Sequence, residues 1–539
     1  MTIWPQCRFE VCRRPVRLIL LACGLLTGIA SSSAAQAATP SPAATRCAAL
    51  TKFEMPGLSL TIDKTEWIAP GPVPPDPPFP PLPGILPAYC RLDGTLDRRQ
   101  GVGGQTFGIG FAIALPDDWN GRFLMQGGGG LNGRVSMPLG AVASGDRPAL
   151  ARGFAVVTTD TGHKGAVFDP SFMQDQQAAL DFAYLAIGRV ARLAKDVIAR
   201  YYGRPAAHSY FAGCSTGGRE GMVMAERYPG YFDGIVSGAP AMRTGHSNLA
   251  LRVVSVAVNR IAPRDAAGKP LPAQAFSDAD RKALLSAVLD ACDAKDGLED
   301  GMIFATRRCA FDPSTLACSG AKADGCLSPE QVAAIKTAMA GPKDSRGNQV
   351  YPGFLYDSGI TASGPGIPGL LGPGAGSPVT PTAALDMDVD TEIRAIQLDP
   401  QQTATDTADW TNLTTFSISG GKQIFYHGVS DPWFSALDTV GYYERLGASN
   451  GGADSVRGWS RLFLVPGMGH CGGGAQAVDR FDLLTPIVDW VEKGTAPNAV
   501  IATGRSVPGR CRPLCAYPQY ARYKGTGNPE DAANFECTE

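Results

Sequence analysis

The sequence predicts an α/β fold with a doubly wound, mostly parallel sheet, and two observations support this. Short apolar runs recur along the chain and are typical of strands buried on both faces of a sheet. Helical patterns alternate with these runs, as expected for parallel strands joined by covering helices. The predicted strands are 122–125, 154–159, 209–212, 234–237, 423–426 and 462–465, and the predicted helices are 178–202, 436–446 and 480–491.

The length of 539 residues predicts more than one compact unit. Residues 241–415 interrupt the alternation, because they carry helical and loop patterns but few strand signals. We therefore expect a core formed by residues 38–240 and 416–539, with 241–415 inserted as a lid domain. Proline-rich residues 70–84 should form an extended surface strap rather than regular structure. The Gly- and Pro-rich segment 352–381 should be a mobile loop at the lid edge.

Residues 1–37 have the pattern of a signal peptide. Arginines precede an apolar stretch at 18–29 that is too short to span a bilayer securely, and the AQA sequence at 35–37 resembles a cleavage site. We expect a mature chain that begins near Ala38 and is secreted or periplasmic. Lipid attachment at Cys23 is a less favoured alternative. The net charge of −2 favours neither nucleic acid nor an anionic membrane surface as a partner.

The cysteine content fits export to an oxidising compartment. Three of the 14 cysteines lie in the predicted signal peptide, and the remaining eleven are many for a cytosolic protein. No C-x-x-C pair occurs, which argues against a zinc ribbon or thioredoxin-like chemistry. Because eleven is odd, one thiol should remain unpaired.

Residues 213–217 (GCSTG) fit the G-x-S-x-G pattern of a nucleophile elbow. The motif follows the predicted strand 209–212 and opens a helical stretch, which is the strand–turn–helix that exposes a serine hydroxyl above a sheet. This context predicts the α/β-hydrolase fold, with Ser215 as nucleophile and the Thr216 backbone N–H as an oxyanion donor. The alternative is a tight turn with an incidental serine.

A second oxyanion donor is expected from the glycine run 127–130, which follows the strand at 122–125. Glycines let backbone N–H groups approach a substrate oxygen closely. A phosphate-binding loop is the alternative, but the spacing and the following βαβ context of such loops are missing.

The order of the triad in this fold is serine, acid, histidine, so the base should follow the last strand. His470 does so, and no histidine lies beyond it. Asp431 follows the strand at 423–426, where the orienting acid belongs, and Asp438 is a weaker candidate. The remaining histidines are expected to be structural; they are His163, His208, His246 and His427.

Two cysteines flank the predicted triad. Cys214 directly precedes Ser215, and Cys471 directly follows His470. If the serine and the histidine meet, these cysteines can form a disulfide that closes a very long chain loop.

On these motifs the chain resembles the tannase and feruloyl esterase family. The matching stretches are 213–241, YHGVSDPWFSALDT at 426–439, FLVPGMGHCGGG at 463–474 and the C-terminal tail. The resemblance implies a triad of Ser215, Asp431 and His470, and oxyanion donors at Gly130 and Thr216. It also implies five disulfides, which leave Cys511 as the unpaired thiol. They are Cys47–Cys90, Cys214–Cys471, Cys292–Cys309, Cys318–Cys326 and Cys515–Cys537.

The resemblance further implies a structural calcium ion in the lid, at residues 293–302. Carboxylate and carbonyl oxygens from a glycine-containing loop suit calcium, although the spacing is not that of an EF-hand. The implied ligands are the side chains of Asp293, Asp296 and Asp300 and the carbonyls of Leu298 and Met302. From the spacing alone, a solvated acidic turn is an equal alternative.

Esters of aromatic acids, such as feruloyl or galloyl esters, are the expected substrates, with Phe434 stacking on the aromatic ring. The alternative substrate is a terephthalate half-ester, although relatives with that specificity carry Glu where this chain has Thr216. Acyl transfer is a further possible reaction. A non-catalytic protein that binds phenolics or carbohydrates is the alternative of another class.

Overall fold

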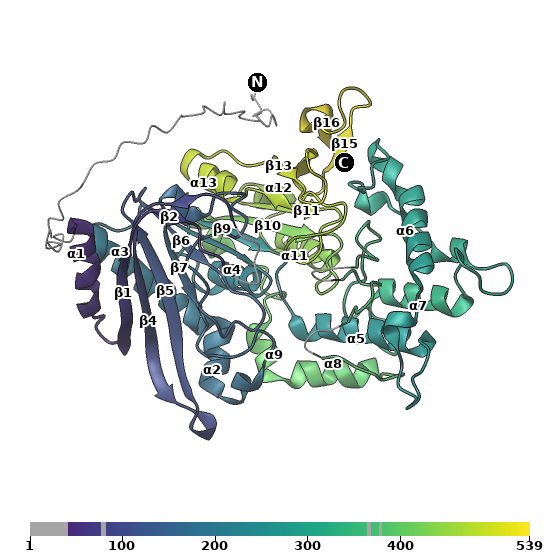
Figure 1. The fold of residues 1–539 in the computed structure, drawn as a ribbon, viewed down its shortest axis with the longest axis horizontal. Coiled ribbons are helices and arrows are strands. Elements are labelled where there is room, and N and C mark those ends of the chain that lie inside the picture. Colours follow the sequence, from purple (N-terminus) through teal and green to yellow (C-terminus); the bar gives the residue numbers. More distant parts are fainter. Residues whose placement is uncertain (1–40, 77–81, 364–367, 377–379) are drawn as a thin grey trace, which may run out of the picture.

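A nine-stranded mixed sheet forms the centre of the computed structural model, which describes residues 41–76, 82–363, 368–376 and 380–539. The predicted signal peptide, 1–37, lies outside these residues. The strand order is β1-β4-β5-β7-β6-β8-β9-β10-β11. Figure 1 shows β1 and β4 at one end of the molecule and helices α5 to α8 at the other.

Six neighbouring strands of the sheet, β7, β6, β8, β9, β10 and β11, run parallel to one another. They correspond to the six predicted strands, which are confirmed. Their bounds are β6 Arg122–Gln126, β7 Ala155–Thr159, β8 His208–Cys214, β9 Gly234–Gly238, β10 Lys422–Gly428 and β11 Ser460–Val465. Nearly all their residues are buried, because helices cover both faces.

Alternate side chains of these strands enter two hydrophobic clusters on opposite faces of the sheet. Phe211 and Phe425 join one cluster with α3, α4 and α11, whereas Tyr210 and Ile424 join the other with α13. The prediction of a doubly wound α/β fold is therefore confirmed. The helices of this core are α2 Gln176–Leu180, α3 Ala186–Tyr202, α4 Thr216–Arg227, α11 Ala436–Ser449, α12 Ala453–Arg457 and α13 Leu484–Lys493.

Three antiparallel strands extend the sheet on the β7 side, and the sequence analysis missed them. They are β1 Leu60–Ile68, β4 Tyr89–Gln100 and β5 Thr106–Pro116, and the short helix α1 Pro42–Ala49 packs beside them. Their half-exposed faces carry charged residues, so β1 and β4 lack the continuous apolar runs of the central strands. The disulfide Cys47–Cys90 joins α1 to β4.

Two predicted helices differ in detail from the structure. The helix predicted at 178–202 is interrupted by a π-helical turn, Asp181–Leu185, whose carbonyls at Phe182 and Ala183 accept hydrogen bonds from the buried Arg219 guanidinium. The helix predicted to begin at residue 480 begins at Leu484 instead. Arg480–Phe481 forms β12, because these residues pair with β13.

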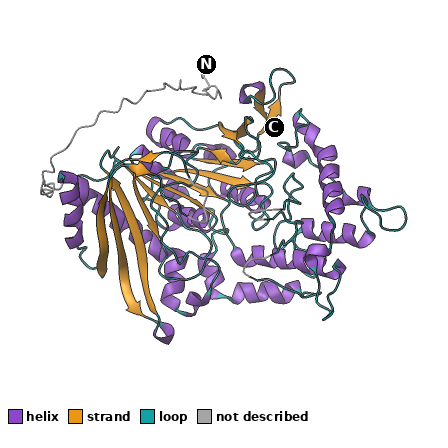
Figure 2. Ribbon diagram, in the orientation of Figure 1, coloured by secondary structure: helices purple, strands orange, loops and turns teal. Residues whose placement is uncertain are grey.

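The inserted region, residues 241–415, is built from helices and loops in its described part (Figure 2). Its helices are α5 Thr244–Ile261, α6 Asp278–Cys292, α7 Pro329–Ala340, α8 Val389–Leu398 and α9 Pro400–Thr405, and α10 Thr414–Ile418 leads back to the core. Helices α5, α6 and α7 pack around a separate hydrophobic cluster that includes Leu251, Val288 and Ile335.

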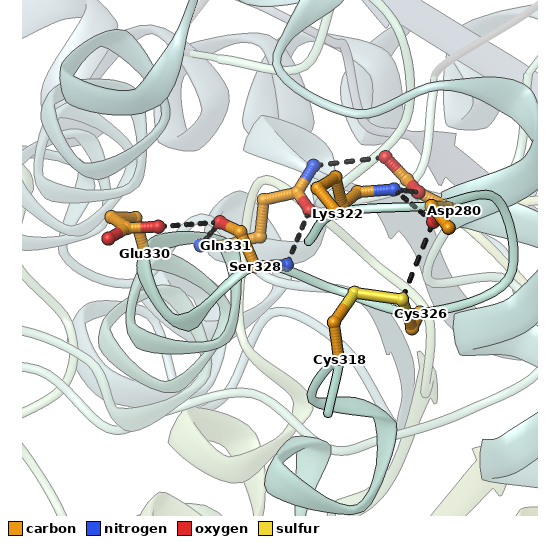
Figure 3. Close-up of a disulfide and its surroundings, with 8 residues drawn as sticks. Asp280, Cys318, Lys322, Cys326, Ser328, Glu330 and Gln331 are labelled. Carbon is orange, nitrogen blue, oxygen red and sulfur yellow. Dashed lines mark hydrogen bonds and ion pairs between the residues drawn. A yellow bond between two sulfur atoms is a disulfide. The ribbon is translucent and has the colours of Figure 1, made fainter. Parts of the chain in front are cut away.

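A disulfide and a buried carboxylate stabilise this region (Figure 3). Cys318 pairs with Cys326, and beside them Asp280 accepts hydrogen bonds from Lys322 at 2.7 Å and from Gln331 at 2.9 Å. The carboxylate thereby connects α6, α7 and the disulfide loop. Cys292–Cys309 is the second disulfide here.

Small sheets complete the core. β12 Arg480–Phe481, β13 Ala499–Thr503 and β14 Cys511–Cys515 form one, and β15 Tyr520–Tyr523 pairs with β16 Phe535–Thr538. Cys515–Cys537 joins the two.

All five predicted disulfides are therefore present. Cys511, predicted to be unpaired, is disulfide-bonded.

The two predicted loop segments differ in outcome. Within the proline-rich segment 70–84, β2 Gly71–Pro72 pairs with β3 Ile85–Leu86, so the expectation of no regular strand was wrong at this end. Residues 77–81 lie outside the description. The described residues of 352–381 form neither helix nor strand, in agreement with the predicted loop.

Throughout the described chain, every helix is too short or too polar to cross a membrane.

Glu492 connects α13 to the sheet and should make stability depend on pH. It accepts hydrogen bonds from Arg122 at 2.7 and 2.6 Å and from the Tyr210 hydroxyl at 2.7 Å. The Arg122 hydrogen bonds lower the pKa of Glu492 from 4.5 to about 2. Its contribution to folding is therefore complete above about pH 4.5 and is lost as the pH falls towards 2.

We expect Glu492→Gln to lower the free energy of unfolding by about 1–3 kcal/mol at pH 7, the usual range for hydrogen bonds to charged groups. The difference from wild type should shrink steadily below pH 4.5. Urea denaturation from pH 7 to pH 2.5 measures it. A difference that stays constant over this range would show that the ionised carboxylate is not the stabilising group.

Candidate active site

Ser215, Asp431 and His470 lie at one edge of the sheet. Ser215 directly follows β8, Asp431 lies three residues after β10, and His470 lies five residues after β11. Since β8, β9, β10 and β11 are consecutive parallel neighbours, their carboxyl ends meet at this edge. Segments more than 200 residues apart in the sequence are thereby brought together.

Ser215 has a strained backbone conformation, with φ 64° and ψ −125°. The turn is possible because Gly213 and Gly217, two residues to either side, lack side chains. A Cβ atom at Gly213 would lie 2.4 Å from the Gly217 carbonyl group, and one at Gly217 would lie 2.7 Å from the Gly128 carbonyl oxygen. These contacts explain the glycines of the motif and identify the turn as the predicted strand–turn–helix elbow.

Asp431 and His470 form a buried hydrogen-bonded pair. The Asp431 Oδ2 atom lies 2.7 Å from His470 Nδ1, and Asp431 Oδ1 accepts hydrogen bonds from the backbone N–H groups of Trp433 and Phe434. Burial alone would raise the pKa of Asp431, but His470 and His427 lower it well below the ordinary range. The carboxylate is thus ionised and fixes the orientation of the His470 ring.

The Nε2 atom of His470 is buried and has no hydrogen-bond partner among the described residues. The disulfide Cys214–Cys471 joins the loop that carries His470 to the elbow, with the two Cα atoms 6.0 Å apart. No hydrogen bond joins Ser215 to His470 within the described chain. In enzymes without a bound substrate this contact is often long, and it shortens when the substrate binds.

Two backbone N–H groups are available for an oxyanion. The N–H groups of Gly130 and Thr216 donate to no residue in the described part of the chain, and Thr216 is the first residue of α4. The Thr216 hydroxyl donates to the Gly130 carbonyl, which joins the two loops directly. The structure thus brings both predicted donor residues to the same place beside Ser215.

Aromatic side chains surround His470. The ring centroids of Trp433 and Phe434 lie 5.0 and 5.3 Å from that of His470, and Phe168 packs edge-on against Trp433 at 5.8 Å. Phe434 was predicted to be at the site. Trp433 and Phe168 were missed, although the position of Trp433 two residues after Asp431 could have indicated it.

The other acid and histidine candidates have partners of their own. Asp438 forms an ion pair with Arg243 rather than with a histidine. His427 contributes to the site from behind, because its Nε2 lies 3.3 Å from Asp431 Oδ2 while its Nδ1 is 2.8 Å from the Thr439 hydroxyl. His163 stacks on Phe172 with the ring centroids 3.5 Å apart.

The acidic loop 293–302 is partly buried and tightly turned. Asp293 accepts a hydrogen bond from Gly301 N–H, and Asp296 accepts one from Phe304 N–H, both at 2.8 Å. Burial raises the pKa of Asp293 and raises that of Asp296 to about 7, and the neighbouring Asp300 adds to both effects. Asp293 Oδ1 is buried and has no hydrogen-bond partner in the described part of the chain, while Asp300 pairs with Arg512. Among the described residues, no three acidic, histidine or cysteine side chains converge on one point.

Comparison with known proteins identifies the family. The model of the family "Tannase and feruloyl esterase" matches residues 94–538, which is most of the chain. The chain belongs to the tannase and feruloyl esterase family. It is therefore a carboxylic ester hydrolase with the α/β-hydrolase fold, as the sequence analysis predicted. The alternative of a non-catalytic binding protein is not supported.

Individual members of the family are similar over nearly the whole chain. Mono(2-hydroxyethyl) terephthalate hydrolase of Piscinibacter sakaiensis is 42% identical over 84% of this chain and 85% of its own length. A probable feruloyl esterase of Arthroderma benhamiae is 31% identical over 91% of this chain and 93% of its own. The crystal structure of feruloyl esterase B from Aspergillus oryzae superimposes with a TM-score of 0.73, at 25% identity, over 92% of this chain and all of that one.

Proposed function

We propose that this chain is a serine esterase that cleaves esters of aromatic acids, with Ser215 as nucleophile, His470 as general base and Asp431 as the orienting acid. The Asp431–His470 pair carries the proposal. It leaves the buried His470 Nε2 without a hydrogen-bond partner among the described residues, and the Cys214–Cys471 disulfide ties the His470 loop to the Ser215 elbow.

The reaction follows from this arrangement. His470 Nε2 takes the Ser215 hydroxyl proton while the oxygen attacks the ester carbonyl carbon, and the Gly130 and Thr216 N–H groups stabilise the oxyanion that forms. His470 then returns the proton to the leaving alcohol, and an acyl-serine remains. His470 then takes a proton from water, whose oxygen attacks the acyl carbon. As the bond between the acyl carbon and Ser215 Oγ breaks, His470 gives that proton to the serine oxygen, and the acid leaves. Asp431 stays ionised and stabilises the imidazolium in both halves.

The rings of Trp433 and Phe434 form an aromatic wall beside His470, which supports an aromatic acyl group as substrate. The Trp433 and Phe434 rings lie within about 5 Å of the base, so a substrate ring bound against them would hold its ester carbon near Ser215. Feruloyl and galloyl esters have such a ring. The 42% identical relative, named for a terephthalate half-ester, makes that ester the second candidate.

A structural calcium ion at residues 293–302 belongs to the same proposal. The unpartnered buried oxygen of Asp293 and the raised pKa values of Asp293 and Asp296 support a cation, because carboxylates buried close together otherwise disfavour their ionised forms. Asp293, Asp296 and Asp300 side chains with the Leu298 and Met302 carbonyls would hold it. Its chemistry would be charge neutralisation and loop rigidity.

Export of the chain to the periplasm or the medium is also proposed. Five disulfides among the described residues, together with the signal-like pattern at 1–37, support an oxidising destination.

The nucleophile is tested with Ser215→Ala. We expect turnover of 4-nitrophenyl acetate to fall at least about 10⁴-fold, in line with the loss of a triad residue in serine hydrolases. A fluorophosphonate probe should label the wild type at Ser215 and should leave the variant unlabelled. Thermal unfolding provides the folding control. Full activity in a folded Ser215→Ala protein would refute the assignment.

The substrate class is tested with a panel of methyl ferulate, methyl gallate and mono(2-hydroxyethyl) terephthalate. We expect the highest kcat/KM for the ferulate or the gallate ester. Phe434→Ala should raise KM for these esters more than for 4-nitrophenyl acetate, which lacks an aromatic acyl group. A preference for the terephthalate half-ester would replace the proposed substrate with the second candidate.

The calcium proposal is tested by metal analysis of the dialysed protein and by chelation. We expect about one calcium ion per chain and a lower melting temperature in EDTA, restored by added calcium. Asp296→Asn should reduce both the metal content and the EDTA effect. A metal-free protein whose melting temperature does not respond to EDTA would remove the site.

A further inference from the structure

Glu220 is a fully buried carboxylate that the triad mechanism does not use. It lies on α4, five residues after Ser215, and none of its surface is exposed. Burying a carboxylate costs free energy unless hydrogen bonds or a nearby opposite charge compensate for it. The contacts of Glu220 therefore indicate what it does.

Both carboxylate oxygens bind the loop that carries Gly130. Oε2 accepts the Gly128 N–H at 3.0 Å, and Oε1 accepts the Asn132 side-chain amide at 2.7 Å. The neighbouring Arg219, also fully buried, supplies a compensating positive charge. The side chain of Glu220 thus connects the nucleophile helix to both sides of the Gly129–Gly130 segment.

Two carbonyl groups of this loop are also occupied. The Gly128 carbonyl accepts Gly217 N–H at 3.1 Å, and the Gly129 carbonyl accepts Asn132 N–H at 2.9 Å. A Cβ atom at Gly127 would lie 2.7 Å from the Gly217 Cα, so the loop is pressed against the elbow. Among the described residues, the N–H groups of Gly129 and Gly130 have no acceptor, so the Gly130 N–H is available as a donor beside the elbow.

A run of four glycines has no side chains with which to hold its own conformation. We propose that Glu220 is the positioning residue that holds this loop in the conformation that directs Gly130 N–H at the oxyanion. The proposal rests on the proposed serine esterase function and deepens it. Glu220 acts through the loop and does not touch the substrate.

The test compares Glu220→Ala and Glu220→Gln with wild type, using 4-nitrophenyl acetate well below the melting temperature. Loss of one oxyanion donor costs about 10²–10³ in kcat, so a loosened donor should cost about 10- to 100-fold in Glu220→Ala. KM should change less than about threefold, because the interaction strengthens in the transition state. The rate of labelling by a fluorophosphonate should fall in parallel.

Glutamine should rescue the loop. Its carbonyl oxygen can accept the Gly128 N–H. If the Asn132 amide group rotates by 180°, the glutamine amide can donate to Asn132 Oδ1, which has no partner among the residues described. Glu220→Gln should therefore keep kcat within about threefold of wild type.

Asn132→Gly removes the second contact and tolerates the φ of 54° at this position. It should lower kcat at least threefold if Glu220→Ala does not fold.

Glu226 provides the matched control. It is a second buried glutamate on the same helix, six residues further along, and its Oε1 atom has no hydrogen-bond partner within the described residues. Glu226→Ala should change the melting temperature and leave kcat unchanged.

Two outcomes would overturn the inference while the esterase function stands. One is a Glu220→Ala protein with wild-type kcat. The other is a loss of kcat that Glu226→Ala shows equally or that glutamine does not rescue. A wild-type protein that neither turns over the ester nor reacts with the fluorophosphonate would refute the proposed function itself, and the role of Glu220 with it.

Discussion

The geometry of the site depends on one buried negative charge, that of Asp431. A carboxylate removed from water must be compensated by hydrogen bonds, and Asp431 has two backbone N–H groups and two imidazoles around it. Each of these contacts also positions a neighbour. The backbone bonds hold Trp433 and Phe434 beside the base, and the imidazole contacts orient His470 and His427. Neutralising Asp431 would therefore disturb the base and the aromatic wall together.

The second constraint is how closely the backbones approach one another. A Cβ atom at Gly428 would lie 2.3 Å from the carbonyl oxygens of Met468 and Gly469, just as the elbow glycines press against β9 and the glycine loop. The Cys214–Cys471 disulfide then fixes the histidine loop to the elbow across a sequence separation of 257 residues. Its linkage should restrict the distance between Ser215 and His470 even where no hydrogen bond joins them.

Sequence predicted the central strands and the site far better than the edge of the fold. Continuous apolar runs in the sequence mark the buried parallel strands. The elbow and cysteine motifs are specific to few structures. Strands β1 and β4 alternate between buried and charged residues, and no such run marks them. The start of α13 was placed four residues too early because Arg480 and Phe481 continue the helical pattern but pair with β13. Contacts made by Glu220 or Phe168 depend on tertiary packing and leave no local pattern.

Hydrogen bonds connect the inserted region to the loops that carry Asp431 and His470. Asp357, fully buried in that region, accepts hydrogen bonds from the Ser430 hydroxyl at 2.6 Å and from the Gly467 N–H at 2.7 Å. Ser430 precedes Asp431, and Gly467 lies in the loop that ends at His470. The Ser435 N–H likewise donates to the Tyr351 hydroxyl at 3.1 Å. Asp357 and Tyr351 thus anchor the inserted region to the loops that carry Asp431 and His470. These anchors mean that its inner edge cannot shift without moving the acid and histidine loops.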